Sequence, residues 1–255
     1  MRIIGVIPSH LASLRFPGKI LLNIHGLPMI EHVRRRAMLS SKLDDVIVAT
    51  CDKEIADVIE SYGGKVIMTS SMHKNGTSRA AEAIENINCS HVVLLQGDEP
   101  LLLPKHIDTI VERIMNAPDI EAWNATGLIE KAEDLDQHSF VKCSVSSHDF
   151  IMYCFRRSPC YSSFKEQNNF IRKILGIIAY KKEFLLEITN LPESEIEQAE
   201  FIEQMRIIEN NYRLKSVLVN PSLPSINEPH DLDIVLDFIK NNKKQQEILN
   251  RILRS

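Results

Sequence analysis

The chain has 255 residues, of which 44% are hydrophobic and 25% are charged, a composition typical of a soluble globular protein with a substantial core. Lys and Arg number 30 against 34 Asp and Glu, and the formal charge of -4 excludes the basic footprint of a nucleic-acid-binding protein. The five cysteines form no C-x-x-C pair, and no run of eighteen apolar residues or signal segment occurs. We therefore expect a cytoplasmic protein with free thiols and neither a nucleic-acid nor a membrane partner.

The first predicted element is a buried strand, Ile3 to Ile7, that stops at Pro8 and leads into a polar loop. This loop carries Arg15, Gly18 and Lys19. In an open α/β sheet, ligands bind beyond the carboxyl ends of the strands, where two cations and a flexible glycine suit a polyphosphate. The alternative is an ordinary connection with solvated charges.

The next segments alternate between strand and helix patterns. They predict, in order, a short strand over 20–24, a helix beginning at Pro28, a strand over 46–49, a helix capped by 50–52 and running to about residue 62, a break at 63–64 and a strand over 65–68. This alternation predicts an α/β fold with a parallel, doubly wound sheet.

A polar loop, HKNGTSR (residues 73–79), precedes the next predicted helix, which runs to about Ile87. Thr77 is the expected N-cap of this helix. Arg79 near the helix start opposes the macrodipole, which favours acids there, so it indicates an anionic or polar ligand nearby. The alternative is an exposed arginine with a small energetic cost.

The most continuous apolar strand, His91 to Leu95, ends in Gln96-Gly97-Asp98-Glu99-Pro100. Mg²⁺ in phosphate-transfer sites takes one or two carboxylates together with phosphate and water oxygens. Asp98, directly past a central strand, is therefore the metal candidate. The alternative is a turn with solvated acids.

Beyond a helix predicted over 104–115, the pattern becomes mixed. Short β-like runs are predicted over 141–145 and 150–155, followed by an apolar run over 174–180, helices over 184–188 and 200–208, and a strand over 214–219. These segments predict an inserted α+β region with antiparallel strands. A terminal helix beginning at Pro229 has Asp231 and Asp233 in its first turn.

Neither G-x-x-x-x-G-K-[ST] nor G-x-G-x-x-G occurs, which disfavours P-loop NTPases and dinucleotide oxidoreductases. Cations and an acid on a parallel sheet suit nucleotidyl transfer instead. The blocks PSHLASLRFPGK, HGLPMIEHV, HKNGTSR, LLQGDEP and IEQAEFIEQMRIIENNYRL are spread over most of the chain, from residue 8 to residue 214. In this order they resemble the sugar-acid cytidylyltransferases, most closely those that act on 3-deoxy-manno-octulosonate (Kdo).

The resemblance implies a nucleotide-diphospho-sugar transferase-like (Rossmann-like) fold, in a single domain over 1–255. A nucleotide-binding half would cover 1–120, an acceptor and dimerisation region 121–220, and a return segment with the C-terminal helix 221–255. It further implies a homodimer through the 140–215 region. The implied activity is CMP transfer from CTP, with Mg²⁺, to the anomeric hydroxyl of a 2-keto-3-deoxy sugar acid in lipopolysaccharide biosynthesis, with release of pyrophosphate.

The resemblance also assigns roles to individual residues. The phosphates would be held by Arg15, Gly18 and Lys19 with His10 beside them, and the cytidine would lie near Gly76, Thr77 and Arg79. Mg²⁺ would bind Asp98 and Asn227. The sugar acid would face Gln96, Arg157, Glu203 and Gln204. Independently, such a reaction needs positioning and charge stabilisation around an in-line attack on the α-phosphorus.

Three positions depart from the family pattern. His10 stands where the family has an arginine, Ile174 where it has a histidine, and Asn227 where a second metal-ligating aspartate is expected. A histidine titrates near neutrality, and an amide brings no charge to a metal. These departures leave two alternatives open. The acceptor could be an amino-Kdo, a phosphate or a phosphonate, or the protein could be a catalytically weakened nucleotide-binding homologue.

Overall fold

The computed structural model describes residues 1–13 and 16–254, which form two compact units. The first unit contains residues 1–108 and 223–255, and the second contains residues 109–222. Among the described residues, no helix combines the length and the apolar character needed to cross a membrane.

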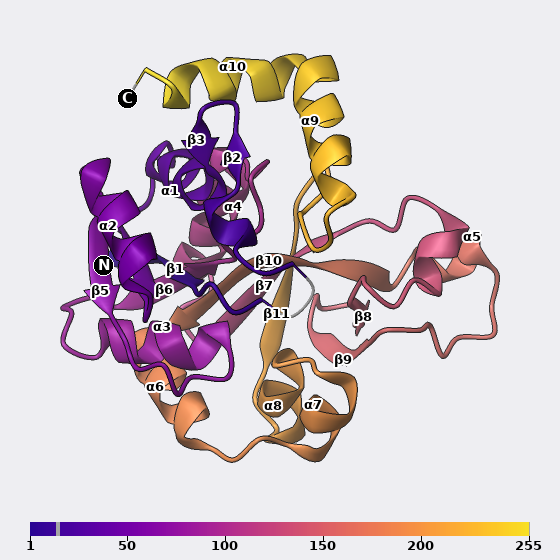
Figure 1. Ribbon diagram of the computed structural model, residues 1–255. Helices are drawn as coiled ribbons and strands as arrows, with labels where there is room; N and C mark the ends of the chain where they lie inside the picture. The colour runs from indigo at the N-terminus through magenta and orange to yellow at the C-terminus, as the bar shows by residue number, and fades with distance from the viewer. Residues whose placement is uncertain (14–15, 255) are drawn as a thin grey trace. The chain divides into compact units, whose positions relative to one another are not determined.

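The first unit is built on a parallel sheet with the strand order β6-β1-β4-β5 (Figure 1). Its strands are β1 (Ile3–Ser9), β4 (Asp45–Thr50), β5 (Lys65–Met68) and β6 (His91–Leu95), with a small hairpin of β2 (Asn23–Ile24) and β3 (Leu27–Pro28). All seven residues of β1 are buried, as expected for a central parallel strand covered on both faces. The strand extends through Pro8, where the sequence pattern predicted its end.

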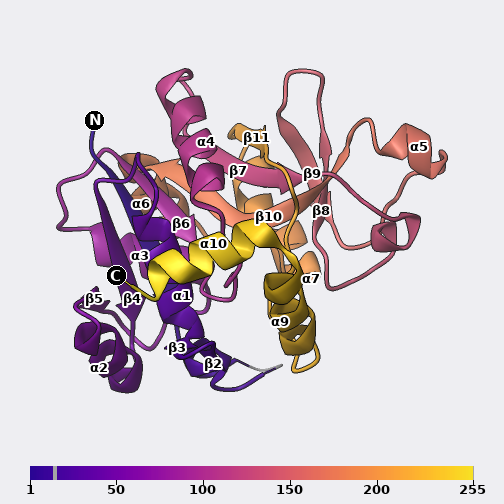
Figure 2. The same cartoon turned by 90° about the horizontal axis from the view of Figure 1, so that it is seen from above.

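Helices connect the strands of this unit. They are η1 (Lys19–Leu21), α1 (Met29–Met38), α2 (Lys53–Ser61), α3 (Gly76–Ile84), the first turns of α4 (Pro104–Met115), α9 (Asp231–Asn241) and α10 (Lys243–Ile252). Both α1 and α3 pack against β1 and β4, and α10 lies beside α1 (Figure 2). The fully buried Arg36 of α1 donates to Gln245 Oε1 of α10 at 2.7 Å, which ties the C-terminal helix to the unit.

The second unit has a mixed sheet. Its strands are β7 (Ala122–Gly127), β8 (Lys142–Val145), β9 (Ile151–Phe155), β10 (Ile171–Lys181) and β11 (Leu214–Leu218), and its helices are the rest of α4, η2 (Ala132–Leu135), α5 (Phe164–Gln167), α6 (Lys182–Asn190), α7 (Glu195–Glu200) and α8 (Gln204–Glu209). β10 pairs antiparallel with β7 and β8, whereas β11 pairs parallel with β7. The predicted α/β class, with an inserted mixed region, is confirmed.

Several predicted boundaries were wrong. The expected strand over 20–24 divides into η1 and the two-residue β2, and the terminal helix divides at Asn242. The helix predicted over 200–208 is interrupted at Phe201, which has a left-handed φ of 55°. A buried ion pair spans the interruption, because Arg206 of α8 reaches back to Glu197 of α7 at 2.6 Å.

Candidate functional site

A cavity of about 240 Å³ lies in the first unit, at the carboxyl ends of β1 and β6. Residues 8–10 and 13, residues 19 and 20, residues 73–76 and 79, and residues 96–98 line it. Its described lining includes three permanent cations, Lys19, Lys74 and Arg79, against the single carboxylate of Asp98. The predicted phosphate loop, HKNGTSR loop and acid after β6 are therefore brought to one cavity, whose charge favours an anion.

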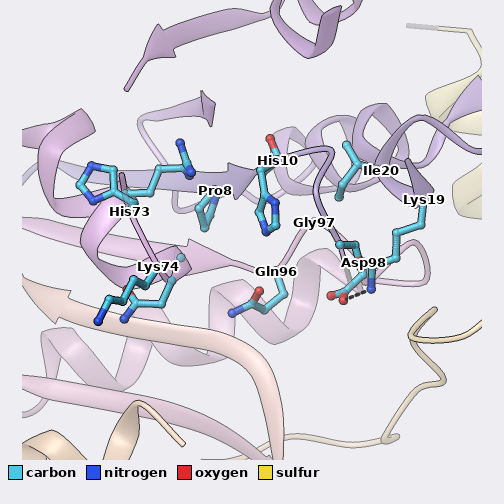
Figure 3. Close-up of a pocket in the computed structure, with 14 residues that line it drawn as sticks. Pro8, His10, Lys19, Ile20, His73, Lys74, Gln96, Gly97 and Asp98 are labelled. Carbon is cyan, nitrogen blue, oxygen red and sulfur yellow. Dashed lines mark hydrogen bonds and ion pairs between the residues drawn. The ribbon is translucent and has the colours of Figure 1, made fainter. Parts of the chain in front are cut away.

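Lys19 and Asp98 form an ion pair at one end of this cavity (Figure 3). Lys19 Nζ donates to Asp98 Oδ2 at 2.6 Å and to the carbonyl oxygen of Ile226 at 2.7 Å. The lysine is 7% exposed, and the Asp98 side chain keeps 24% of its surface open. Two segments distant in the chain thus hold one ammonium group, and the carboxylate still faces the cavity.

The loop before Lys19 is held by backbone and carboxylate contacts. Gly18 has a φ of 72°, the left-handed region that suits glycine, and its N–H donates to the Leu11 carbonyl at 3.0 Å. Leu11 N–H in turn donates to Asp52 Oδ2 at 2.8 Å. The end of β4 therefore anchors the loop after β1. Arg15 lies outside the described residues, so its predicted phosphate contact stays a prediction.

Arg79 lies in α3 with its side chain buried against the preceding loop. Its Nη1 donates to Thr69 Oγ1 at 2.7 Å and to the Ser70 carbonyl at 3.2 Å. The N-cap of α3 is Asn75, whose side chain accepts from Ser78 N–H, so the prediction of Thr77 as N-cap was wrong. Thr77 is absent from the cavity lining, whereas Gly76 and Arg79 belong to it.

Gly76 allows the loop to approach the end of β1 closely. A Cβ at this position would lie 3.0 Å from Pro8 Cγ, tighter than ordinary van der Waals contact. A side chain would therefore push this cavity wall away from β1. Gly76 was predicted as a site residue by resemblance, and its close approach to Pro8 supplies a physical reason for glycine.

His10 lies between the two ends of the cavity, across from Gln96 (Figure 3). Loss of hydration inside the cavity is the main cause that lowers the pKa of His10 below 6.5, and the Arg79 and Lys19 cations lower it further. The Asp52 carboxylate acts in the opposite direction. Without a ligand, His10 is therefore a mainly neutral group at pH 7, and a bound polyphosphate would raise its pKa.

His73 and Lys74 form the other end of the cavity (Figure 3), although the sequence did not predict either of them as a site residue. His73 Nε2 contacts Glu82 Oε2, and this hydrogen bond is the largest cause that lowers the Glu82 pKa. Ser70 N–H donates to the same carboxylate at 2.9 Å. The sequence signal for this end of the cavity was the HKNGTSR block, whose first two residues are His73 and Lys74.

Asp98 as a metal ligand stays a prediction, and the described residues offer no preformed cage for an ion. The described residues contain no group of three His, Cys, Asp or Glu side chains placed to enclose a metal. Mg²⁺ is compatible with this donor set, because it takes one or two carboxylates and completes its octahedron with phosphate and water oxygens. Asp98, partly open and at the cavity, fits that requirement.

Asn227 follows a residue that contacts both members of the ion pair. Ile226 N–H donates to the Asp98 carbonyl at 3.0 Å, and the Ile226 carbonyl accepts from Lys19. The N–H groups of Asn227 and Glu228 both donate to Asp231 Oδ2 at 2.8 Å. Asp231 is therefore committed to holding this turn, and a metal contact by Asn227 stays a prediction.

The residues expected on the sugar side lie partly in the second unit. Gln96 lines the cavity, whereas Arg157, Glu203 and Gln204 belong to the second unit. The Arg157 side chain is 68% exposed and lies 4.0 Å from the Asp136 carboxylate. Gln204 at the start of α8 donates to Asn124 Oδ1 at 3.0 Å.

Comparison with known proteins agrees along the chain. Residues 4–216 match the cytidylyltransferase family. The 3-deoxy-manno-octulosonate cytidylyltransferase of Geotalea daltonii is 34% identical over 252 residues, covering 94% of this chain and 99% of that protein. The enzyme of the same name from Thermodesulfovibrio yellowstonii is 37% identical over 245 residues, covering 91% and 95%, respectively.

A solved structure also aligns over nearly the whole chain. The CMP:2-keto-3-deoxy-manno-octonic acid synthetase complexed with CTP superposes with a TM-score of 0.88 at 32% sequence identity. The alignment covers 94% of this chain and 99% of that one.

Proposed function

The chain belongs to the cytidylyltransferase family, and from this membership we propose that it transfers CMP from CTP to the anomeric hydroxyl of Kdo, releasing pyrophosphate. The observation that carries the proposal is the cation-lined cavity containing the Lys19–Asp98 pair, in a chain that aligns end to end with Kdo cytidylyltransferases. The reaction is an in-line displacement at the α-phosphorus, which depends on positioning and on stabilisation of charge.

We assign the nucleotide to the cavity of the first unit. Lys19 supplies a fixed positive charge for phosphate oxygens, which gain negative charge as the anomeric oxygen attacks and pyrophosphate departs. Lys74 and Arg79 add positive charge within the same walls, and His10 adds a further charge when it is protonated. Gly76, Thr77 and Arg79 are assigned to the cytidine side.

Members of this family use a divalent metal, and we propose Mg²⁺ held by Asp98 and the triphosphate, with Asn227 as a neutral second ligand. When bound, the ion neutralises phosphate charge and aligns the triphosphate. The protein's own contribution is to keep the Asp98 carboxylate at the end of β6, where the Lys19 ammonium fixes its orientation.

We assign the sugar acid to Gln96, Arg157, Glu203 and Gln204. The guanidinium of Arg157 is largely exposed and can pair with a carboxylate, and the amide of Gln204 can hydrogen-bond a hydroxyl. The Ile174 side chain is apolar, so we assign the polar recognition of the sugar acid to these four side chains.

We further propose a cytoplasmic homodimer that acts in lipopolysaccharide biosynthesis. The second unit exposes large apolar side chains, among them Met152 at 52% and Phe201 at 83%, which supports a protein interface within the 140–215 region. No disulfide joins any of the five cysteines, all of which lie among the described residues, in keeping with a reducing compartment. Sedimentation velocity of the purified protein tests the assembly.

The test of the activity is pyrophosphate release from CTP and Mg²⁺ with a panel of acceptors that includes Kdo, an amino-Kdo and simple phosphates and phosphonates. We expect turnover with Kdo and CTP, and little with ATP, GTP or UTP. Turnover only with another acceptor would reassign the substrate. CTP binding without turnover for every acceptor would favour a weakened nucleotide-binding homologue.

A further inference from the structure

Asn124 is a fully buried amide in β7, beside an irregularity in the neighbouring strand. β10 pairs with β7 at Ile174↔Thr126 and next at Ile178↔Asn124, so three residues of β10 span the single intervening residue of β7. A bulge of this kind interrupts the ladder and leaves backbone groups without ladder partners. Asn124 Nδ2 fills the interruption by donating to the Leu175 carbonyl at 3.1 Å.

The same nitrogen donates to the Ala125 carbonyl at 2.8 Å, so both hydrogens of the Asn124 amide are used. The opposite amide orientation would direct an oxygen at two carbonyl oxygens, which is repulsive. The backbone therefore determines which way the Asn124 amide faces. Its Oδ1 points to Gln204 of α8 and accepts from Gln204 Nε2 at 3.0 Å.

The orientation of Gln204 follows from that contact. With Nε2 directed at Asn124, the carbonyl oxygen Oε1 must point away from it. Among the described residues, none donates a hydrogen bond to Gln204 Oε1. The bulge of β10 thus sets the face that Gln204 presents, through one buried side chain.

We propose that Asn124 is a positioning residue that holds Gln204 with Oε1 toward the acceptor, where it receives a hydrogen bond from a hydroxyl of the sugar acid. This inference rests on the proposed function, which assigns Gln204 to the acceptor side. An amide that is free to turn offers a donor as readily as an acceptor. A fixed carbonyl oxygen favours a hydroxyl donor and repels an oxygen that only accepts.

The experiment compares wild type with Asn124→Leu, Gln204→Met and the double variant, measuring KM and kcat separately for Kdo and for CTP. Asn124→Leu should weaken the binding of Kdo equally in the ground state and the transition state. It should therefore raise the KM for Kdo about fivefold to fiftyfold and leave the KM for CTP within about twofold. The KM for Kdo of the double variant should be no higher than that of Gln204→Met alone, because both changes remove the same Asn124–Gln204 contact.

Kdo analogues that lack single hydroxyl groups provide the second readout. Wild type should discriminate against one of them, and this discrimination should disappear in both single variants. Asn124→Ser, which retains an O–H for a bulge carbonyl but is too short to hold Gln204, should behave like Asn124→Leu and serves if the leucine variant does not fold. Thr126→Val is the matched control, because it removes the buried Thr126–Ser216 hydrogen bond of 2.8 Å from the same strand without contacting Gln204.

The outcomes separate this inference from the proposed function. Four results would overturn the role of Asn124 while leaving Kdo as substrate. They are additive effects of the two changes, an equal rise in the KM for CTP, unaltered discrimination among the Kdo analogues, and the same rise in the KM for Kdo in Thr126→Val. If wild type does not turn over Kdo with any efficiency, the proposed function itself fails, and with it the basis of this inference.

Discussion

Replacing Lys19 by methionine should lower kcat by two to three orders of magnitude while the protein remains folded. Methionine retains an unbranched, apolar stem of similar length, so the change removes mainly the ammonium group. Lys19 is 7% exposed, and its Nζ lies 2.6 Å from Asp98 Oδ2. Its position is therefore set before any ligand arrives, as electrostatic stabilisation of a transition state requires.

The substitution has two separate costs, one in the reaction rate and one in the stability of the fold. Loss of one preorganised donor costs about 2.7–4 kcal/mol in the transition state, or roughly 10²–10³ in kcat. The substitution also leaves the Ile226 carbonyl without this donor, which costs about 1–3 kcal/mol of stability. In a domain of this size such a loss lowers Tm by several degrees, about 2–4 °C for each kcal/mol, so the variant should still be folded at 25 °C.

The assay is continuous pyrophosphate release at saturating CTP, Mg²⁺ and Kdo, with Tm measured on the same samples. Lys65→Met is the matched control, because Lys65 forms a similar 2.5 Å pair with Asp45 but is 66% exposed and outside the cavity. It should retain wild-type kcat. A Lys19→Met enzyme with kcat within about threefold of wild type would refute the assignment of the reacting phosphates to this cavity, since it is far below the expected loss.

Three further predictions concern other residues. The pKa of His10 is lowered in the free protein and should rise when CTP binds, so the affinity for CTP should fall as the pH rises from the His10 pKa of the free protein to that of the complex. His10→Arg should flatten this dependence. CTP titrations of both proteins at saturating Mg²⁺ test the contact, and parallel pH profiles would contradict it. Asn227→Asp should lower the Mg²⁺ concentration for half-maximal pyrophosphate release, and an unchanged value would show that residue 227 lies outside the metal shell. Glu197→Gln should destabilise the fold by about 3 kcal/mol, because it removes the carboxylate that faces the buried Arg206 guanidinium. Asp119→Asn, in an exposed pair, should have little effect. Equal denaturation midpoints for the two variants would contradict this prediction.

The sequence by itself determined the strands and the chemistry at their ends. Apolar runs such as His91–Leu95 predict buried parallel strands, since their periodicity is local, and Asp98 follows that run directly. The polar blocks at residues 8–19 and 73–79 lie between such elements, so their meeting at one cavity follows from a parallel sheet. Resemblance supplied the substrates, which no local pattern specifies.

Only the tertiary structure decided which groups touch. Lys19, Asp98 and Ile226 are far apart in the chain, and their contact depends on how separate segments pack. The same holds for the break at Phe201 within an otherwise helical pattern, and for Asn124, which reads as an ordinary strand residue until the bulge of β10 is seen. Periodicity reports which face of an element is buried, whereas partners across the fold are set by long-range packing and hydrogen bonding that no window of sequence contains.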